Sequence, residues 1–337
     1  MDQKIYKSPG FRNWNHDHGW NQKNAKEISL AWGGKYNIKK SNGYLLKGIR
    51  ERVELITRLS KEHSIKLLCK VLKVARSTYY SILNHKASNR EIENNILKSK
   101  IFKVYCDNRK VYGSIKITRI LRDNGYQKLS VNRVSRLMKQ LGIRSVTIRK
   151  FKNYRNKQNE HSELKNLVNQ NFSAQKPNQI WLSDITYIHT VKNGWTYLAS
   201  VLDVCTRKIV GYSYGRKMDR SLVISALTKA WQNQNYPNNV ILHSDRGSQY
   251  TSSEYIAAAE RMGFRLSYSK KGCPFDNAPM ESFHSVLKKE EVYLKHYSSF
   301  YEANIRLFDY INGFYNRNRI HSAINYLSPI HFEKSLL

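Results

Sequence analysis

The sequence has 337 residues, more than one typical domain, so we expect at least two compact units. Its 58 Lys and Arg against 25 Asp and Glu give a formal net charge of +33. An excess this large repels itself unless a polyanion is near, so we predict nucleic-acid binding over a basic surface that serves only solubility. No segment has the ~20 apolar residues that span a bilayer, and no signal peptide is visible, so we expect a cytoplasmic protein without a membrane partner.

Residues 1–43 are basic and have no sustained apolar period, so we treat them as an N-terminal extension without an assigned role. From residue 44 to about 150 we predict a helical DNA-binding region. Apolar residues spaced three or four apart between Val53 and Leu72 predict two amphipathic helices. A short turn and a new helix capped by Ser77 or Thr78 should follow, which fits either a helix-turn-helix or an ordinary helical hairpin.

A second helical pair is predicted further along this region. Its first helix, rich in isoleucine from Ile115 onward, should stop at Asn124-Gly125. Ser130 should cap a helix from Val131 to Leu141 that Gly142 ends. The second helix of a helix-turn-helix reads bases in the major groove, whereas the alternative is a solvated structural helix. We predict DNA contacts from the polar face of this helix, namely Asn132, Arg133, Arg136 and Lys139.

Residues 151–176 are polar and basic, which predicts a linker or an arm that tracks DNA. Three β-rich runs then predict an antiparallel meander, and two helix–strand pairs and a further helix follow it. The order βββαβαβα is typical of the α/β ribonuclease-H-like fold, a mixed sheet flanked by helices. We assign residues 177–292 to this catalytic core and residues 293–337 to its C-terminal helical part.

Three acids stand where apolar residues or strand ends are expected, and a carboxylate there costs desolvation unless a cation or donor is present. Asp184 interrupts a strand with the parity of Ile180 and Leu182, so it should emerge from the more buried face. Asp245 ends a buried strand, at an edge where such sheets bind ligands. Glu281 lies in the first turn of a helix, whose positive end favours an ionised carboxylate.

These three acids suit Mg²⁺ or Mn²⁺, hard cations that prefer oxygen ligands, and two such ions can activate a nucleophile and steady a leaving oxygen. Lys288 shares one helical face with Glu281, so a cation lies near the acid. Lys270 and Lys271, in the preceding loop, are further candidates for DNA contact. Composition alone does not exclude the neighbouring acids Asp203, Asp219, Asp276, Glu290 and Glu291.

The sequence segments around the acids are more specific for one protein family than any single acid is. The segments WLSDITYI, HSDRGSQYTS and SKKGCPFDNAPMESFHSVLKKE place 60 residues between the two aspartates and 35 between Asp245 and Glu281. Together with FYNRNRIHSAINYLSPIHFEK and the upstream segments LLCKVLKVARSTYYS and YGSIKITRILRDNGY, they resemble the insertion-sequence transposases of the IS-three family. The resemblance covers about residues 44–337, and we cannot match the residues before it.

The resemblance implies that Asp184, Asp245 and Glu281 are the catalytic acids, which bind two Mg²⁺ or Mn²⁺ ions, and that Lys288 contacts DNA near the cleavage point. It implies cleavage at the 3′ ends of a DNA element and strand transfer to a target. The implied partners are the terminal inverted repeats, target DNA, further copies of the chain and an upstream-frame helix-turn-helix protein. Two alternatives stay open: a silent DNA-binding regulator, and a ribonuclease-H-like nuclease that never joins strands.

Overall fold

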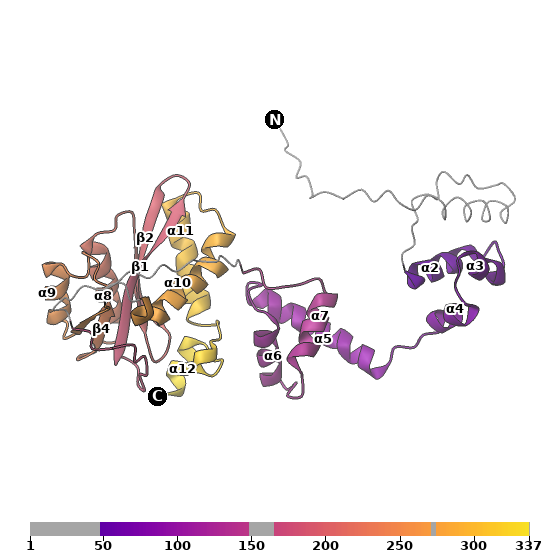
Figure 1. Cartoon of the computed structure of the whole chain (residues 1–337), viewed down its shortest axis with the longest axis horizontal. Coiled ribbons are helices and arrows are strands. Elements are labelled where there is room, and N and C mark those ends of the chain that lie inside the picture. Colours follow the sequence, from indigo (N-terminus) through magenta and orange to yellow (C-terminus); the bar gives the residue numbers. More distant parts are fainter. Residues whose placement is uncertain (1–47, 148–164, 271–273, 337) are drawn as a thin grey trace. The chain divides into compact units, whose positions relative to one another are not determined.

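The computed structural model describes residues 48–147, 165–270 and 274–336 (Figure 1). The chain divides into two compact units, of which the first ends at Ile92 and the second spans Glu93–Leu337. None of the helices in the described ranges combines the length and the apolar composition needed to cross a lipid bilayer.

The first unit contains three short helices around a small core. They are α2 (Ile49–Leu59), α3 (Ile65–Val71) and α4 (Arg76–Leu83). Its largest buried side chain is Tyr79, and the other core residues are Val53, Ile56, Leu68, Cys69 and Val74. The two helices expected between Val53 and Leu72 are confirmed as α2 and α3.

The predicted cap of the third helix is wrong. The helix begins at Arg76 after Ala75, which makes no side-chain cap, so Ser77 and Thr78 lie inside its first turn. The physical reason lies in the turn before it. Lys73 adopts a left-handed φ of 52°, and the Val74 N–H donates to the Cys69 carbonyl at 3.0 Å. This closes α3 tightly, so the chain re-enters a helix earlier than the hydroxyl residues suggested.

The second unit begins with helical elements. Helix α5 (Asn89–Asp107) has no counterpart in the sequence-based expectations, although Leu97, Ile101 and Tyr105 follow one another at four-residue spacing and are buried. Helices α6 (Ser114–Asp123) and α7 (Val131–Gln140) confirm the second predicted pair.

The ends of that pair form as expected. The Ser130 hydroxyl accepts from the Arg133 N–H at 3.2 Å and caps α7. Gly125 and Gly142 have φ values of 97° and 66°, a left-handed conformation that favours glycine and ends each helix. The apolar face of α7 is buried through Val134, Leu137 and Met138.

A five-stranded sheet forms the centre of the second unit. Its strands are β1 (Ile180–Thr190), β2 (Gly194–Asp203), β3 (Ile209–Gly215), β4 (Ile241–Ser244) and β5 (Arg265–Tyr268). They lie in the order β3-β2-β1-β4-β5, with β1, β2 and β3 antiparallel and with β4 and β5 parallel to β1. This mixed sheet with its flanking helices confirms the ribonuclease-H-like fold.

Helices cover both faces of the sheet. They are α8 (Arg220–Asn233), α9 (Ser253–Arg261), α10 (Ala278–Glu290), α11 (Phe300–Phe308) and α12 (Pro329–Ser335). Short 3₁₀ segments span Pro274–Asn277, Val292–Leu294 and Ser322–Ile324, and a π-helical segment spans Asp309–Tyr315. Figure 1 shows α8 and α9 on one side of β1 and α10 on the other.

The two faces separate along β1. Trp181 packs with residues of α8 and α9, whereas Leu182 and Ile188 pack in the core that contains Met280 and Leu287 of α10. Since side chains alternate along a strand, Asp184 lies on the α10 face, as its parity predicts.

The end of the predicted linker packs on the sheet edge. The Tyr268 N–H donates to the Lys165 carbonyl at 3.0 Å, and the Leu167 N–H donates to the Ser267 hydroxyl at 2.9 Å. Residues 148–164 lie outside the described residues, so the basic arm expected there stays a prediction. The proposed domain boundaries at residues 43, 150, 176 and 292 also stay predictions.

Candidate active site

Two of the three candidate acids lie on neighbouring parallel strands. Asp184 lies within β1, and Asp245 directly follows Ser244, the last residue of β4. The register pairs Ser183 with Ser244, so the next residue on each strand is one of the aspartates. The sheet therefore places both carboxylates side by side at the carboxyl end of β4.

The charge of one aspartate changes the pKa of the other. Loss of water around its carboxylate raises the pKa of Asp245, the Gly247 N–H at 2.9 Å lowers it, and the charge of Asp184 raises it again. Within the described ranges, neither aspartate has a lysine or arginine partner. Two like charges without a lysine or arginine partner are the arrangement that a bound cation would relieve.

The third acid, Glu281, lies in the first turn of α10, which begins after Asn277 and has a proline in that turn. The positive end of the helix favours its ionised form. The same helix carries His284, whose Nδ1 lies 3.5 Å from Oδ2 of Asp184. However, no three His, Cys, Asp or Glu side chains of the described residues are gathered closely enough to hold a metal ion. The two aspartates are thus neighbours on the sheet, and Glu281 lies on the helix whose His284 contacts Asp184.

The five acids that composition could not exclude each have hydrogen-bond or ion-pair partners in the fold. Asp203 accepts from the backbone N–H of Asn178 at 2.7 Å, and both the N–H and the hydroxyl of Thr206 donate to it. Asp219 caps α8 by accepting from the Leu222 N–H at 3.1 Å. Each of these two acids completes a local backbone turn.

Asp276 is buried and accepts three hydrogen bonds of 2.8–2.9 Å, from the side chains of Asn166 and Gln170 and from the backbone N–H of Lys270. This network fixes the loop that precedes α10 to the segment that packs on β5. Asp276 is therefore accounted for by a structural role.

Glu290 and Glu291 are also paired. Glu290 accepts from the Arg319 guanidinium at 2.8 and 2.9 Å and from the Tyr310 hydroxyl at 2.8 Å. Glu291 forms an ion pair of 2.7 Å with Lys295. All five acids that composition alone could not exclude thus have structural partners.

Two residues near Asp184 were missed by the sequence analysis. His284 lies three positions after Glu281, and this helical spacing was a signal that could have found it. Ser200 is paired with Asp184 across β1 and β2, which becomes visible only with the strand register.

The residues predicted to read DNA on α7 divide into two kinds. Asn132 and Arg136 are exposed. The Arg133 guanidinium instead contacts Glu93 at 2.8 Å and Asn94 at 2.8 and 3.0 Å, which ties α7 to α5. Arg133 thus has a structural partner that the sequence did not indicate.

The predicted DNA-contacting lysines of the core are found in different settings. Lys270 is exposed at the end of β5, and Lys271 lies outside the described residues. Lys288 is half-buried on α10, seven positions after Glu281 and therefore on the same helical face.

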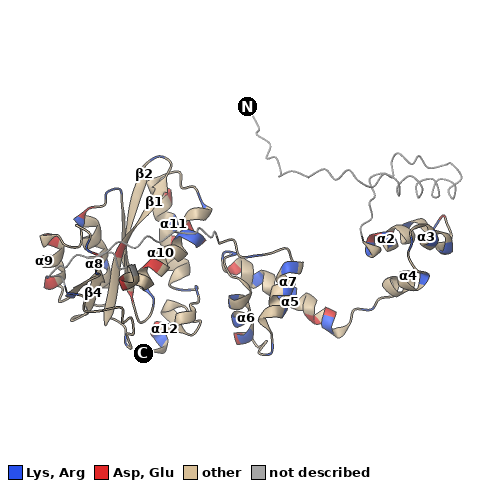
Figure 2. Cartoon of the chain, viewed as in Figure 1, with Lys and Arg blue, Asp and Glu red and all other residues tan. Residues whose placement is uncertain are grey.

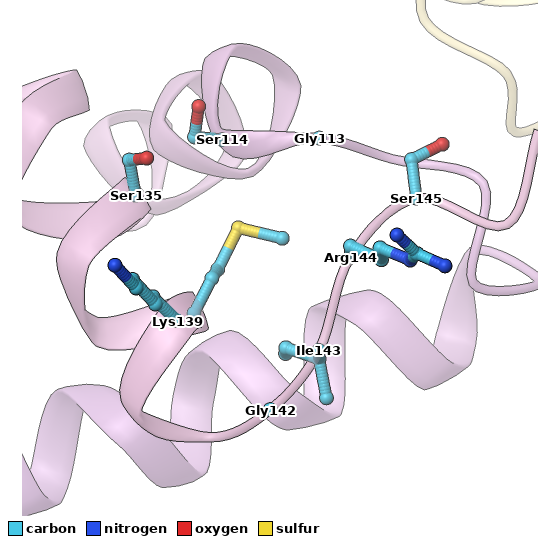
Figure 3. Close-up of a pocket in the computed structure, with 9 residues that line it drawn as sticks. Gly113, Ser114, Ser135, Lys139, Gly142, Ile143, Arg144 and Ser145 are labelled. Atoms are coloured by element: carbon cyan, nitrogen blue, oxygen red, sulfur yellow. The ribbon is translucent and has the colours of Figure 1, made fainter. Parts of the chain in front are cut away.

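Basic residues also line a hollow in the helical part of the second unit. In Figure 2 the ribbon of α6 and α7 carries blue segments, which mark Lys and Arg. A pocket of about 440 Å³ lies between the start of α6 and the turn after α7. Figure 3 shows Lys139 and Arg144 at this pocket, and Ser114 and Ser135 also line it. Cations thus gather around the helix predicted to read DNA.

Comparison with protein-family models gives three matches. An integrase core domain matches residues 174–274, a second integrase core domain model matches residues 281–337, and an HTH-like domain matches residues 91–151. The fold and these matches define the class: an integrase-core protein with an HTH-like region, of the polynucleotidyl transferase type.

Curated relatives extend over most of the chain. The transposase for insertion sequence element IS904 of Lactococcus lactis is 39% identical over 75% of this chain and 99% of its own length. The transposase InsF for insertion sequence IS3A of Escherichia coli is 37% identical over 82% of this chain and 96% of its own length. The chain belongs to the IS-three family of insertion-sequence transposases.

Solved structures show a more distant likeness. The simian T-cell lymphotropic virus intasome in complex with the PP2A regulatory subunit B56 gamma matches at a TM-score of 0.40 and 16% identity, over 68% of this chain and 73% of that chain. The HTLV-2 integrase catalytic core domain in complex with magnesium matches at 0.37 and 16% identity, over 48% of this chain and 99% of that chain.

Proposed function

We propose that the chain is a DNA transposase that cleaves the 3′ ends of its element and transfers them to a target in a reaction that needs a divalent metal. The observation that carries this proposal is the aspartate pair. Asp184 and Asp245 lie side by side, without a lysine or arginine partner in the described residues, and the charge of Asp184 raises the pKa of Asp245.

The donor set fits Mg²⁺ or Mn²⁺. Asp184, Asp245 and Glu281 offer only carboxylate oxygens, the ligands that hard cations prefer. When bound, two such ions activate the attacking water or 3′-hydroxyl and stabilise the leaving oxygen. Asp184 and Asp245 hold their charges at one end of β4, Glu281 supplies the third carboxylate from α10, and Lys288 positions a backbone phosphate.

The test is strand transfer with DNA that carries the element's ends. Asp184→Asn, Asp245→Asn and Glu281→Gln should each abolish cleavage and joining while DNA affinity is retained, and EDTA should abolish both steps in the wild type. Glu254→Gln is the matched control, because this acid is exposed and pairs only with Arg220 in the described chain. Strand transfer by any of the three site variants would refute the proposal, and cleavage without joining would favour a nuclease.

We propose that Lys288 contacts DNA near the cleaved bond. A point charge positions phosphate without performing bond exchange, so Lys288→Ala should weaken engagement of the DNA end and leave metal affinity unchanged. Titration with Mn²⁺ and a footprint of the DNA end measure the two effects separately. Loss of Mn²⁺ binding equal to that of Glu281→Gln would give Lys288 a structural role instead.

We further propose that α7 reads the terminal repeats. Arg136→Ala should cost about 1–3 kcal/mol of binding on the terminal-repeat sequence and much less on random DNA. Arg133→Ala is an instructive comparison, because its contacts to Glu93 and Asn94 predict a loss of stability. An equal loss of affinity on all duplexes for Arg136→Ala would make α7 an element that only positions phosphate.

The proposed partners are the terminal inverted repeats and target DNA, bound by a homo-oligomer in the bacterial cytoplasm, with an upstream-frame helix-turn-helix protein as a further partner. Light scattering of the chain with terminal-repeat DNA would measure how many copies assemble. A single copy on each DNA, active alone in strand transfer, would remove both proposed protein partners.

A further inference from the structure

Two buried polar side chains flank Asp184 on the face that α10 covers. Ser200 lies opposite Asp184 in the β1–β2 pair and has no exposed surface. His284 is 8% exposed, and its Nδ1 is 3.5 Å from Oδ2 of Asp184. The other oxygen of Asp184 accepts from the Ile185 N–H at 2.8 Å.

Each of these two side chains also has a polar atom without a hydrogen-bond partner. In the described part of the chain, the Ser200 hydroxyl and Nε2 of His284 are both buried and unpaired. An unmet buried donor or acceptor costs roughly 1–3 kcal/mol, so such an atom calls for a reason.

A histidine elsewhere in the same unit shows what a structural role looks like. His243 is fully buried, and its two ring nitrogens lie 2.8 Å from the Ser267 hydroxyl and 3.0 Å from the Ser269 hydroxyl. Both nitrogens of His243 are therefore satisfied by the fold. His284 differs, because its Nδ1 lies within 3.5 Å of the Asp184 carboxylate and its Nε2 has no hydrogen-bond partner in the described residues.

We propose that His284 is a positioning residue for Asp184, an inference that rests on the proposed metal-dependent function. In the tautomer with hydrogen on Nδ1, the ring donates toward Oδ2 and restricts the rotation of the carboxylate. The ring stands one turn after Glu281, so the same contact holds the helix of the third acid against the strand of the first. Partners of this kind orient metal-binding carboxylates, and their loss costs about 10–100-fold in metal affinity or activity.

The test is Mn²⁺ binding to the full chain, measured by calorimetry without DNA. His284→Ala should weaken binding about 10–100-fold. His284→Asn keeps an amide donor near the place of Nδ1 and should restore most of the affinity. His284→Gln reaches toward the place of Nε2 and should behave as the alanine variant does. Ser200→Ala is the matched control, since it removes the other unpaired buried atom, which forms no hydrogen bond with Asp184, and it should bind as the wild type.

The outcomes distinguish a failure of the positioning role of His284 from a failure of the proposed metal-dependent function. If Asp184→Asn keeps Mn²⁺ binding, the proposed function fails. If Asp184→Asn loses binding while His284→Ala keeps it, only the positioning role fails. Equal affinity of the Asn and Gln variants would also overturn the role, even if the alanine variant does not fold. Thermal unfolding without metal adds a readout, because a merely structural histidine would lower the melting temperature of the Gln and Asn variants alike.

Discussion

Helix α10 carries an acid near each end, and the two acids have opposite surroundings. Glu281 lies in the first turn, where the helix dipole favours an anion, on the same helix as His284, which contacts Asp184. Glu290 lies in the last turn, where the dipole disfavours an anion, and Arg319 binds it with two nitrogens.

The difference separates a structural acid from a functional one. At Glu290 the fold supplies the cation. Burial lowers the pKa of Arg319, but the hydrogen bonds and the charge of the Glu290 carboxylate outweigh it and hold that pKa above its usual range. At Asp184 and Asp245 the fold supplies a second negative charge instead. A bound cation would relieve this crowding, which is why we propose the aspartate pair, and not Glu290, as the part of the site that does chemistry.

The largest expected effect on the free energy of unfolding comes from Glu290, the acid that is paired with Arg319. Glu290→Gln leaves the Arg319 charge buried without its partner, which should lower the free energy of unfolding by about 3–5 kcal/mol. Urea denaturation followed by circular dichroism measures this change. The comparison predicts that the loss is the same with and without Mg²⁺, because no metal belongs at this end of the helix.

A double variant sharpens this point. Glu290→Leu with Arg319→Met removes both charges, so it should recover much of the stability that the single variant loses. If Glu290→Gln instead leaves stability unchanged and abolishes strand transfer, the two ends of α10 have been assigned the wrong way round.

Removing a charge from the aspartate pair should raise the free energy of unfolding, opposite to the change expected at Glu290. Asp245→Asn removes one of two like charges, so it should raise the free energy of unfolding by roughly 0.5–1 kcal/mol in metal-free buffer while abolishing activity. Mg²⁺ should stabilise the wild type, because it binds the native state, and have little effect on the variant. A variant less stable than the wild type would mean that the Asp245 charge supports the fold.

Sequence reasoning located the acids because each stands at a position with a local signature. The parity of Asp184, the strand end before Asp245 and the first helical turn at Glu281 are all properties of neighbouring residues. The capping of α7 by Ser130 is local in the same way, and it too is confirmed. Local chemistry thus predicted most of the fold that positions the site.

The features that sequence reasoning missed depend on distant partners. Asp276 could not be dismissed as a catalytic acid because its partner Asn166 is 110 positions away. The structural bond between Arg133 and Glu93 spans 40 positions. No local pattern indicates such distant pairs. The sequence therefore could not distinguish charged residues with structural partners from charged residues that are candidates for the functional site.

The smallest predicted effect is the pH dependence of the difference between Asp245→Asn and the wild type. Because the pKa of Asp245 is raised in the folded state, chiefly by burial, the folded chain binds more protons than the unfolded chain above the ordinary aspartate pKa. Wild-type stability therefore falls as the pH rises through the raised pKa, whereas the asparagine variant lacks this loss.

The advantage of the variant should be absent in acid, where Asp245 is protonated in both states, and should grow to a plateau above the raised pKa. Denaturation series at several pH values in metal-free buffer measure it, with Glu254→Gln as the control that shows no such rise. Because other titrating groups cancel in the difference, an advantage that is greatest in acid would mean that the Asp245 charge is stabilised by the fold. In that case the contrast between the two ends of α10 would not hold.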